Sequence, residues 1–357
     1  MNLYKNETSY RHDQAPRIGV LITNLGTPAA PTAKAVRPYL REFLSDTRVV
    51  EIPRLIWWFI LNGVVLLTRP PRSAHAYAKI WTEQGSPLLV NTQKQAAAIA
   101  EQLGESYVVA YAMRYGQPSI AAGLQQLKMA NARHIIVLPL YPQYAASSTG
   151  STFDAVAKEL TQWRWVPELR FVGSYHDHEN YINVLAASVK QHWQQHGRAE
   201  KLVMSFHGLP KAHLLQGDPY FCQCHKTGRL LAERLQLSSE QYQITFQSRF
   251  GAQEWLQPYT DVTLKQLPTQ GVKNIDVICP GFSSDCLETL EEIMIQNQEL
   301  FKAAGGEQFK YIPALNAEPA HIEMLTQLIK QQTQGWQLSQ EGSINIKVRA
   351  QQQGAQQ

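Results

Sequence analysis

The sequence predicts an α/β protein built from two similar, doubly wound units, each with a parallel sheet covered by helices on both faces. Short apolar runs rich in Val, Ile and Leu alternate with longer amphipathic segments between residues 18 and 330. This alternation is typical of buried parallel strands joined by helices. In addition, several short motifs return in the same order in the second half of the chain, which indicates a duplicated unit.

Each half contains four predicted strands with helices between them, the arrangement of a Rossmann-like fold. The predicted strands cover residues 18–23, 107–113, 135–140, 169–172, 202–205, 244–246, 275–279 and 309–312, and the main helices 33–44, 92–103, 153–163, 181–196, 227–235, 286–300 and 320–330, with a further helix after Gly251. We expect an N-terminal domain over residues 1–175 and a C-terminal domain over 176–333. The tail 334–357 is rich in glutamine and poor in apolar residues, so we expect it to be disordered.

The internal repeat rests on matching strand ends. The first strand of the first half ends in Asn24-Leu-Gly-Thr-Pro28, and the first strand of the second half ends in His207-Gly-Leu-Pro210. The second strand of each half runs into Arg114-Tyr-Gly116 or Arg249-Phe-Gly251, and the third into a loop that contains proline. The shared order places each pair of motifs at equivalent points of two doubly wound units.

Composition narrows the class of protein. The 357 residues are 44% hydrophobic and 17% charged, with a net charge of +4. The charge is mildly basic and no basic run is present, so we expect no nucleic-acid partner. Residues 1–14 are polar and lack the pattern of a signal peptide, and four cysteines do not form a disulfide framework in a chain this long. We therefore expect a cytoplasmic protein.

One apolar stretch, residues 55–67, reads Leu-Ile-Trp-Trp-Phe-Ile-Leu-Asn-Gly-Val-Val-Leu-Leu. It is too short to span a bilayer, which takes about 20 residues. Two interpretations remain open: a buried helix, or an exposed apolar lip whose Trp57 and Trp58 suit a membrane interface. The second would place the protein at the surface of the inner membrane.

His207 ends the buried strand that begins the second half, and Gly208 and Pro210 stop the strand there. A polar side chain in this position lies at the carboxyl edge of a parallel sheet, where α/β proteins bind ligands. Histidine can transfer a proton near neutral pH or bind a metal. The alternative is a histidine that only stabilises a strand-to-loop turn.

An acidic stripe follows the third strand of the second half. On a helical wheel that begins near Asp285, the carboxylates of Asp285, Glu288 and Glu292 lie on one face. Helix capping would explain Asp285 and Glu288 without any catalytic function. Capping does not explain Glu292, which lies beyond the first turn.

A dense run of small polar residues, 140–151, follows the third strand of the first half. Its amides and hydroxyls would suit an anion at a helix start. The chain lacks both the Walker loop and the glycine fingerprint of dinucleotide-binding folds, so the sequence does not support nucleotide binding.

Together these motifs closely resemble the ferrochelatases, which insert ferrous iron into protoporphyrin IX in the last step of haem synthesis. The resemblance runs from about Arg17 to Lys330, and the Asp285-Cys-Leu-Glu-Thr-Leu-Glu-Glu-Ile293 form is similar to the Gram-negative bacterial type. The matching segments are Leu25–Pro28, Phe43–Asp46, Gly85–Pro87, Arg114–Gly116, Tyr141–Tyr144, Ser148–Gly150, Ser205–Gly208, Phe246–Gly251 and Cys279–Leu290.

The resemblance implies functions for individual residues. It implies that His207 and the facing Glu288 are the catalytic and iron-binding pair, and that Glu292 and Asp285 continue an acidic path for the metal. It also implies that Leu25, Arg114, Tyr115 and Tyr144 contact the porphyrin. Where some relatives have a histidine at the start of this helix, this chain has Cys286.

The chemistry requires residues of these types. Iron enters the ring only after two pyrrole protons leave, so the enzyme needs a base with a pKa near the working pH and a site that distorts the ring. His207 fits the base. His207 and Glu288 also fit a mixed nitrogen and oxygen ligand pair for ferrous iron, and the sequence does not separate the two functions.

Three alternatives remain open on the sequence. The protein acts on protoporphyrin, or it is a chelatase of the same fold for coproporphyrin or sirohydrochlorin, or it is a haem- or porphyrin-binding protein without activity. We further expect no iron–sulfur cluster. Cys222 and Cys224 have the wrong spacing for common clusters, and Ala145 and Ala146 stand where cluster-bearing relatives often place a cysteine.

Overall fold

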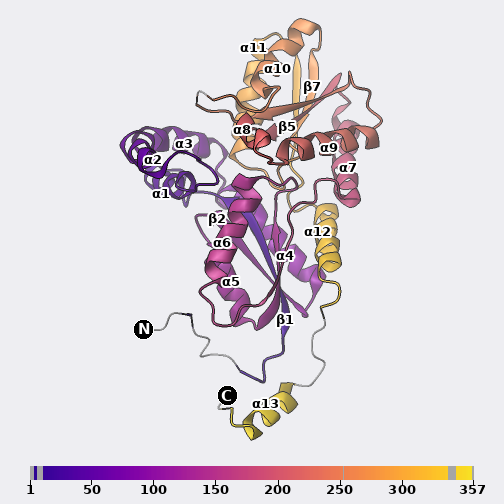
Figure 1. Ribbon diagram of the computed structural model, residues 1–357. Coiled ribbons are helices and arrows are strands. Elements are labelled where there is room, and N and C mark those ends of the chain that lie inside the picture. The colour runs from indigo at the N-terminus through magenta and orange to yellow at the C-terminus, as the bar shows by residue number, and fades with distance from the viewer. Residues whose placement is uncertain (1–3, 6–10, 252, 337–342, 356–357) are drawn as a thin grey trace.

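The computed structural model describes residues 4–5, 11–251, 253–336 and 343–355. It confirms the predicted α/β class: two four-stranded parallel sheets with helices on their faces, one above the other in Figure 1. The strand orders, β2-β1-β3-β4 and β6-β5-β7-β8, are the same if the strands of each half are counted separately. This equivalence is what a duplicated doubly wound unit requires.

The first half contains β1 (Arg17–Gly26), α1 (Ala33–Leu44), α2 (Arg54–Ile60), η1 (Leu61–Val65), α3 (Leu66–Ile80), α4 (Pro87–Leu103), β2 (Tyr107–Tyr115), α5 (Ile120–Met129), β3 (Ala132–Pro139), η2 (Ala146–Gly150), α6 (Ser151–Leu160) and β4 (Glu168–Phe171). The second half contains α7 (Glu179–His196), β5 (Lys201–His207), α8 (Lys211–Leu215), α9 (Tyr220–Arg234), β6 (Tyr242–Gln247), α10 (Thr260–Gln266), η3 (Leu267–Gln270), β7 (Asn274–Ile278), η4 (Leu287–Asn297), α11 (Gln298–Ala303), β8 (Gln308–Ile312), α12 (Pro319–Gln332) and α13 (Ser343–Gln352). The elements η1, η2 and η4 are π-helices, and η3 is a 3₁₀ helix.

Alternate residues of the central strands enter different hydrophobic cores. In β1, Leu21 packs with residues of α5 and α6, whereas Val20 and Ile22 join a core on the other face. In β5, Val203 packs on the α10 and η4 side, and Met204 joins the same core as Val20. Strand side chains alternate between the faces of a sheet, so one face of each central strand contributes to the same core. This core contains residues of both halves.

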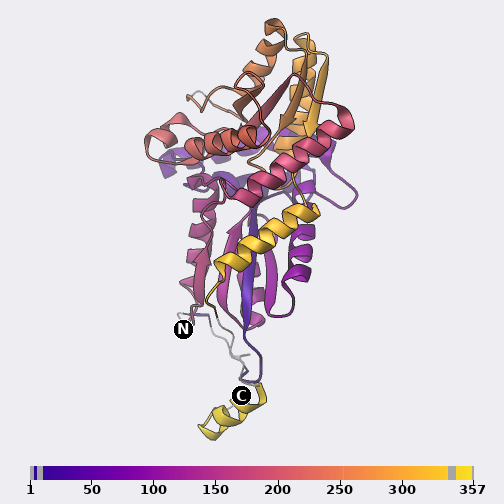
Figure 2. The ribbon, with the colours of Figure 1, turned by 90° about the vertical axis from the view of Figure 1, so that its right-hand side faces the viewer.

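The helix α12 returns from the second half to the first. It packs against α4 and β3, and Figure 2 shows it crossing the face of the first sheet. Ile322, Leu325 and Ile329 are buried in the shared core. The predicted domain boundaries at residues 175 and 333 remain a proposal, and this helix packs across the division that they make.

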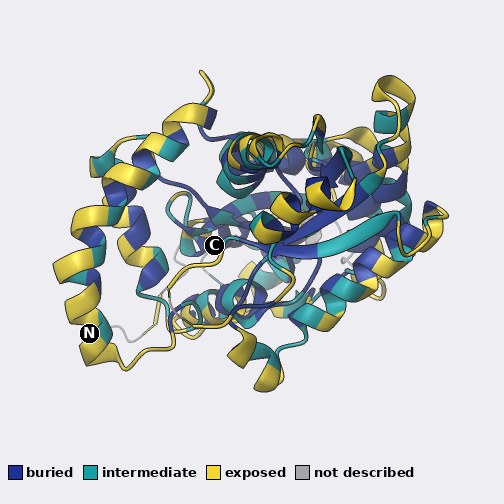
Figure 3. Cartoon of the chain, turned by 90° about the horizontal axis from the view of Figure 1, so that it is seen from above, coloured by how far each residue is buried: buried dark blue, intermediate teal, exposed yellow. Residues whose placement is uncertain are grey.

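The helices α1, α2, η1 and α3 form a projection beside the sheets, at the left of Figure 1. Its inner side is a small core of its own, which includes Tyr39 and Leu66. Its outer side is exposed, as the yellow residues at the left of Figure 3 show, and it carries apolar side chains such as Leu55, which is 73% exposed, and Phe59, which is 62% exposed. Of the two interpretations of residues 55–67, the structure therefore has the exposed lip.

Several elements differ from the sequence-based expectation. The helix α5 was not predicted, because Gly123 lowers the helix propensity of its sequence. In the structure a Cβ at Gly123 would lie 2.7 Å from Cδ1 of Leu21, so glycine allows α5 to pack closely on β1. The tail, expected to be disordered, carries the helix α13, whose Ala, Gln, Lys and Arg residues favour helix. The helix α3 continues through Pro70 and Pro71.

Gly26, at the carboxyl end of β1, provides a test of the fold. Its φ is +112°, and a Cβ there would lie 1.8 Å from the carbonyl oxygen of Tyr115. We expect Gly26→Ala to lower the free energy of unfolding by about 3 kcal/mol, the upper end for a strained backbone conformation. Gly63→Ala is the control, because no atom lies within 4 Å of its added Cβ. Equal unfolding midpoints in urea for the two variants would contradict this description of the strand end.

Candidate active site

A cavity of about 720 Å³ opens where the carboxyl edges of the two sheets meet. Both halves supply its walls through the ends of their first strands and the loops after their third strands. Apolar and aromatic side chains dominate the lining: Leu25, Phe43, Leu44, Val49, Val50, Ile52, Trp57, Val65, Leu88, Leu140, Leu209, Trp255 and Phe282. The predicted ligand-binding edge is therefore present twice, and the two edges form one site.

His207 lies at the end of β5 and lines the cavity. Its Nδ1 is 2.7 Å from the carbonyl oxygen of Gly208. A carbonyl oxygen only accepts, so Nδ1 carries the hydrogen and Nε2 holds the lone pair in the neutral ring. His207 is thus oriented as a proton acceptor or a metal ligand through Nε2.

Gly208 allows β5 and β6 to approach closely at this edge. Its amide donates to the carbonyl oxygen of Gln247 at 2.7 Å, and a Cβ at Gly208 would lie 2.7 Å from that same oxygen. Glycine is therefore required beside His207 for a steric reason.

Glu288 lies in the first turn of η4 and lines the cavity with His207. The cap of this helix is Cys286, not Asp285, and the amide of Cys286 donates to Oγ1 of Thr289 at 2.9 Å. The carbonyl oxygen of Glu288 accepts from Nε2 of Gln247 at 2.8 Å. Because capping falls to Cys286 and Thr289, the Glu288 carboxylate is available to the cavity.

Glu292 lies behind Glu288 and is held by the end of β6. Oε1 of Glu292 accepts from the amide of Ser248 at 2.7 Å, and Oε2 accepts from the Ser248 hydroxyl and from Nε2 of Gln247. The pKa of Glu292 is raised, chiefly by burial and in addition by the negative charge of Glu288. Hydrogen bonds from Ser248 and the charge of His207 act in the opposite direction. Glu292 therefore interacts electrostatically with both His207 and Glu288.

Asp285 is placed away from the cavity. Its carboxylate accepts from Tyr311 at 2.7 Å, from Nδ2 of Asn316 at 2.7 Å and from Thr289 at 3.0 Å. The wheel that joined Asp285 to Glu288 assumed an α-helix, but the helix begins after Cys286 and has π geometry over Leu287–Asn297. The structure therefore gives Asp285 a supporting position in the loop rather than one on the cavity wall.

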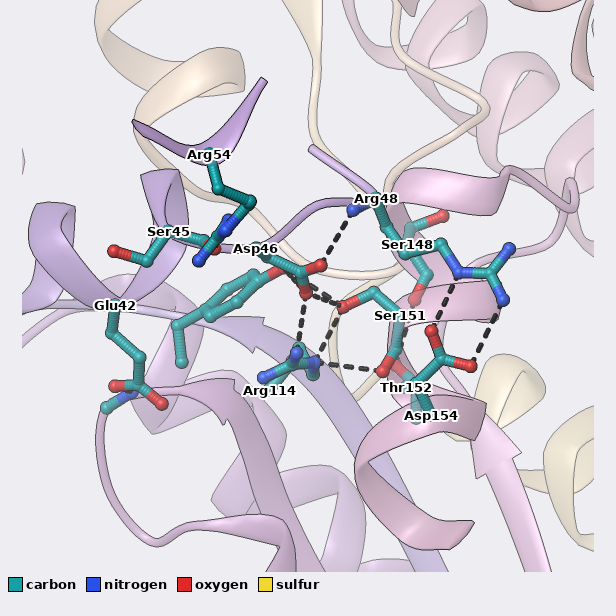
Figure 4. A network of polar contacts seen from close by, with 12 residues as sticks. Glu42, Ser45, Asp46, Arg48, Arg54, Arg114, Ser148, Ser151, Thr152 and Asp154 are labelled. Carbon is teal, nitrogen blue, oxygen red and sulfur yellow. Dashed lines mark hydrogen bonds and ion pairs between the residues drawn. The ribbon is translucent and has the colours of Figure 1, made fainter. Parts of the chain in front are cut away.

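Arg114 and Tyr115 also support the wall without lining it. As Figure 4 shows for Arg114, both converge on Asp46: Nη2 of Arg114 and the Tyr115 hydroxyl reach Oδ2 of Asp46 at 2.5 and 2.9 Å. Ser151 joins the same network, with its hydroxyl 2.6 Å from Nε of Arg114. The Tyr115 ring packs edge-on against Phe43, which lines the cavity.

This network is largely buried, and its charges are paired within the protein. Tyr115 is fully buried, and burial raises the pKa of its hydroxyl. Burial alone would also raise the pKa of Asp46, but hydrogen bonds from Ser151, Arg48 and Tyr115 and the charge of Arg114 lower it. The Arg114 charge is therefore satisfied by the protein itself, which disfavours direct binding of a substrate carboxylate.

Leu25 lines the cavity as expected, but Tyr144 does not. The Tyr144 amide donates to Oε1 of Gln223 at 2.7 Å, which ties its loop to α9. The next amide of the expected anion cradle, that of Ala146, donates to Oδ2 of Asp218 at 2.8 Å. The anion at this helix start is thus a side chain of the second half, although Ser147 and Ser148 still face the cavity.

Sequence reasoning assigned no function to two further sets of residues. Gln247 and Ser248 hold Glu288 and Glu292, and their position at the end of the strand next to β5 was the available signal. Arg69 lines the cavity from α3, and its guanidinium stacks 5.4 Å from the Phe250 ring across the site. Burial lowers the pKa of Arg69, and no ion pair to it is present among the described residues.

Comparisons with known proteins identify relatives of this chain. A ferrochelatase family model matches residues 17–333. The chain is 56% identical to the ferrochelatase of Marinobacter nauticus over 351 residues, which cover 97% of this chain and 95% of the relative. It is 57% identical to the ferrochelatase of Idiomarina loihiensis over 337 residues, 93% of each chain.

Among solved structures, the sirohydrochlorin chelatase SirB from Bacillus subtilis subspecies spizizenii, in complex with cobalt, matches with a TM-score of 0.51 at 11% identity. The match covers 88% of this chain and 95% of that one. At this identity the likeness shows the fold, which is the Rossmann-like fold of chelatases. The family model and the full-length relatives together show that this chain belongs to the ferrochelatase family, the lyases that insert ferrous iron into protoporphyrin IX.

Proposed function

We propose that His207 and Glu288 form the iron-insertion centre of this ferrochelatase. The observation that carries the proposal is that both side chains line one apolar cavity, with Nε2 of His207 left to accept by the Nδ1 contact to Gly208. Insertion replaces two pyrrole protons by one ferrous ion. His207 accepts the two protons one after the other at Nε2 and releases the first to solvent before it takes the second, and Glu288, backed by Glu292, guides the metal.

The surroundings favour proton acceptance over permanent metal binding by His207. In the described part of the chain, no group of three or more His, Cys, Asp or Glu side chains is arranged to hold a metal ion. A two-residue pair suits a metal that must be passed on to the four nitrogens of the ring. As in the ferrochelatase family, iron is a substrate of this site.

The cavity walls suit protoporphyrin. The ring is flat and apolar apart from two propionates, and the cavity is lined mainly by apolar side chains. Arg69 is the partly buried cation in the lining, and an unpaired buried cation favours a carboxylate. Coproporphyrin, with four propionates, would bring more carboxylates into the same apolar walls, which is unfavourable.

Replacement of His207 separates its two functions. If His207 accepts a proton, His207→Ala lowers kcat by about 10²–10⁴-fold, the usual effect of losing a general base, with little change in the KM for iron. If it is an iron ligand, the KM for iron rises as well. The loss of protoporphyrin fluorescence under anaerobic conditions measures both constants. Activity within about threefold of wild type would contradict any catalytic function for His207.

Replacement of Glu288 and of Glu292 should have different effects on activity. Glu288→Gln keeps the volume and removes the charge that faces the cavity, so we expect a large loss of kcat with an unchanged melting temperature. Glu292→Gln should lose less activity. Because burial raises the pKa of Glu292, its contribution to stability is present at low pH and is lost as pH rises above 4.5 through the folded-state pKa.

Thermal unfolding at a series of pH values tests the direction in which the contribution of Glu292 to stability changes with pH. The melting temperature of the wild type relative to Glu292→Gln should fall as pH increases. A rise would mean that Glu292 is stabilised as a carboxylate.

We further propose that the lip contacts a membrane surface and admits porphyrin from it. Apolar side chains of α2, η1 and α3 are exposed next to the cavity, with Trp58 at 58%, whereas Trp57 turns inward and donates from Nε1 to the carbonyl oxygen of Leu44. Among the described residues, no helix is long and apolar enough to cross a bilayer. We propose a cytoplasmic location with peripheral contact at the inner membrane through this lip, and no nucleic-acid partner, since the net charge of +4 is only mildly basic.

The lip can be tested without disturbing the cavity. Trp58→Ser with Phe59→Ser should reduce co-sedimentation with liposomes and raise the KM for porphyrin presented in them, because exposed apolar area supplies the binding energy. Trp165→Ser, at a site that is 49% exposed on the first half, is the matched control. Equal liposome binding by the double variant and the control would rule out the lip as the contact.

We also propose that the protein has no iron–sulfur cluster. Cys224, Cys279 and Cys286 are buried, and burial raises the pKa of each thiol, which disfavours the thiolate that a cluster needs. Anaerobic purification followed by absorption spectroscopy tests this. A brown protein with about two irons per chain would show a [2Fe–2S] centre.

A further inference from the structure

An ion pair outside the cavity joins the two halves at the helix that carries Glu288. Nζ of Lys79, in α3, lies 2.9 Å from Oε1 of Glu291, in η4. Oε2 of Glu291 accepts from Nε2 of Gln296 at 2.7 Å. The Glu291 side chain is 5% exposed and that of Lys79 is 37% exposed, so Lys79 is the partly hydrated partner of a buried carboxylate.

Neither residue lines the cavity, but Glu291 lies between two residues that form the site. Glu288 faces the cavity and Glu292 faces Ser248. In a helix, the direction of one side chain fixes the direction of its neighbours. The contact between Lys79 and Glu291 therefore acts on the same helix that presents Glu288 and Glu292, in addition to the contacts of these two residues with Gln247 and Ser248.

The helix η4 has reason to need such a contact. A π-helix is rare and usually short, whereas this one extends over Leu287–Asn297. Three of its residues, Glu288, Glu291 and Glu292, are acidic, and a buried carboxylate without a partner is unfavourable. If Lys79 were neutral, rotation of η4 would hydrate Glu291 and would also turn Glu288 and Glu292.

The helix α3 is placed to hold η4. The two helices are in contact, and α3 also carries Arg69 in the cavity wall and the buried Tyr77. The negative charge of Glu288 acts on both of these side chains. The helix that continues from the lip thus packs along the acidic helix, with Lys79 near its end.

We propose that Lys79 is a positioning residue for iron insertion: by pairing with Glu291 it fixes the rotation of η4, so that Glu288 faces the porphyrin and Glu292 stays behind it. The proposal rests on the function assigned above to Glu288. It goes further in naming a residue of the first half that acts through the second.

The test compares Lys79→Met with the double variant Lys79→Met/Glu291→Gln. The single variant leaves the buried Glu291 without its cation, with Gln296 as its remaining partner, and we expect kcat to fall by about tenfold or more, as for residues that orient metal ligands. Porphyrin affinity, measured by fluorescence, should stay within about twofold of wild type, because the apolar walls are unchanged. Adding Glu291→Gln removes the unpaired charge and should restore kcat to within about threefold of wild type.

Lys226→Met is the matched control, because Lys226 forms an exposed ion pair with Asp177 and should keep wild-type activity. A kcat for Lys79→Met within about threefold of wild type, or a double variant as slow as the single one, would overturn the proposal. If Lys79→Met fails to fold, the double variant decides alone: near-normal kcat supports the proposal, and a lost kcat overturns it. Full activity of Glu288→Gln in the same assay would instead show that the assigned function of Glu288 is wrong.

Discussion

Buried hydrogen bonds between the two halves hold the carboxyl edges of both sheets to a single cavity. Nε2 of Gln95, in α4, donates to the carbonyl oxygens of Ser283 and Asn316, and Oε1 accepts from the Ser284 hydroxyl. The Asn316 side chain in turn accepts from Nδ2 of Asn91 and donates to Asp285. Buried polar groups are costly unless they are paired, so these contacts specify one arrangement of the halves. The position of Glu288 depends on this arrangement, because the loop from Ser283 to Asp285 leads directly into η4.

The two halves contribute different chemistry to that cavity. The first half supplies most of the apolar wall and the Arg69 cation, and the second supplies His207, Glu288 and the residues that hold Glu292. All three π-helices of the described chain border the site, through Val65, Ser148 and Glu288. π-helical turns are frequent at functional sites. Here η2 and η4 follow the equivalent third strands of the two halves, β3 and β7, and η1 lies in the lip between α2 and α3.

Much of this arrangement was predictable from the sequence, for physical reasons. Buried parallel strands appear in the sequence as apolar runs, and a histidine at the end of such a strand lies at the carboxyl edge, so the fold class and the position of His207 followed directly. The position of Leu25 came from the family resemblance. The inward position of Glu288 followed in part, since capping was the alternative and Cys286 fills that position instead. The direction of Asp285 did not follow, because a helical wheel assumes α geometry and a known first residue. Arg114, Tyr115 and Tyr144 do not line the cavity. A sequence motif places a residue near a site but does not show whether its side chain contacts the ligand or supports the residues that do. The Lys79–Glu291 pair joins residues 212 positions apart, which no local pattern predicts.

The central claim is that the porphyrin lies in the cavity between the two carboxyl edges, with its nitrogens next to His207. A crystal structure of the protein soaked with protoporphyrin IX under anaerobic, metal-free conditions tests this most directly. We expect a ring bounded by Leu25 and Trp57, with Nε2 of His207 facing the pyrrole nitrogens and a propionate at Arg69. A ring bound outside the cavity, or one whose nitrogens face away from both His207 and Glu288, would contradict it.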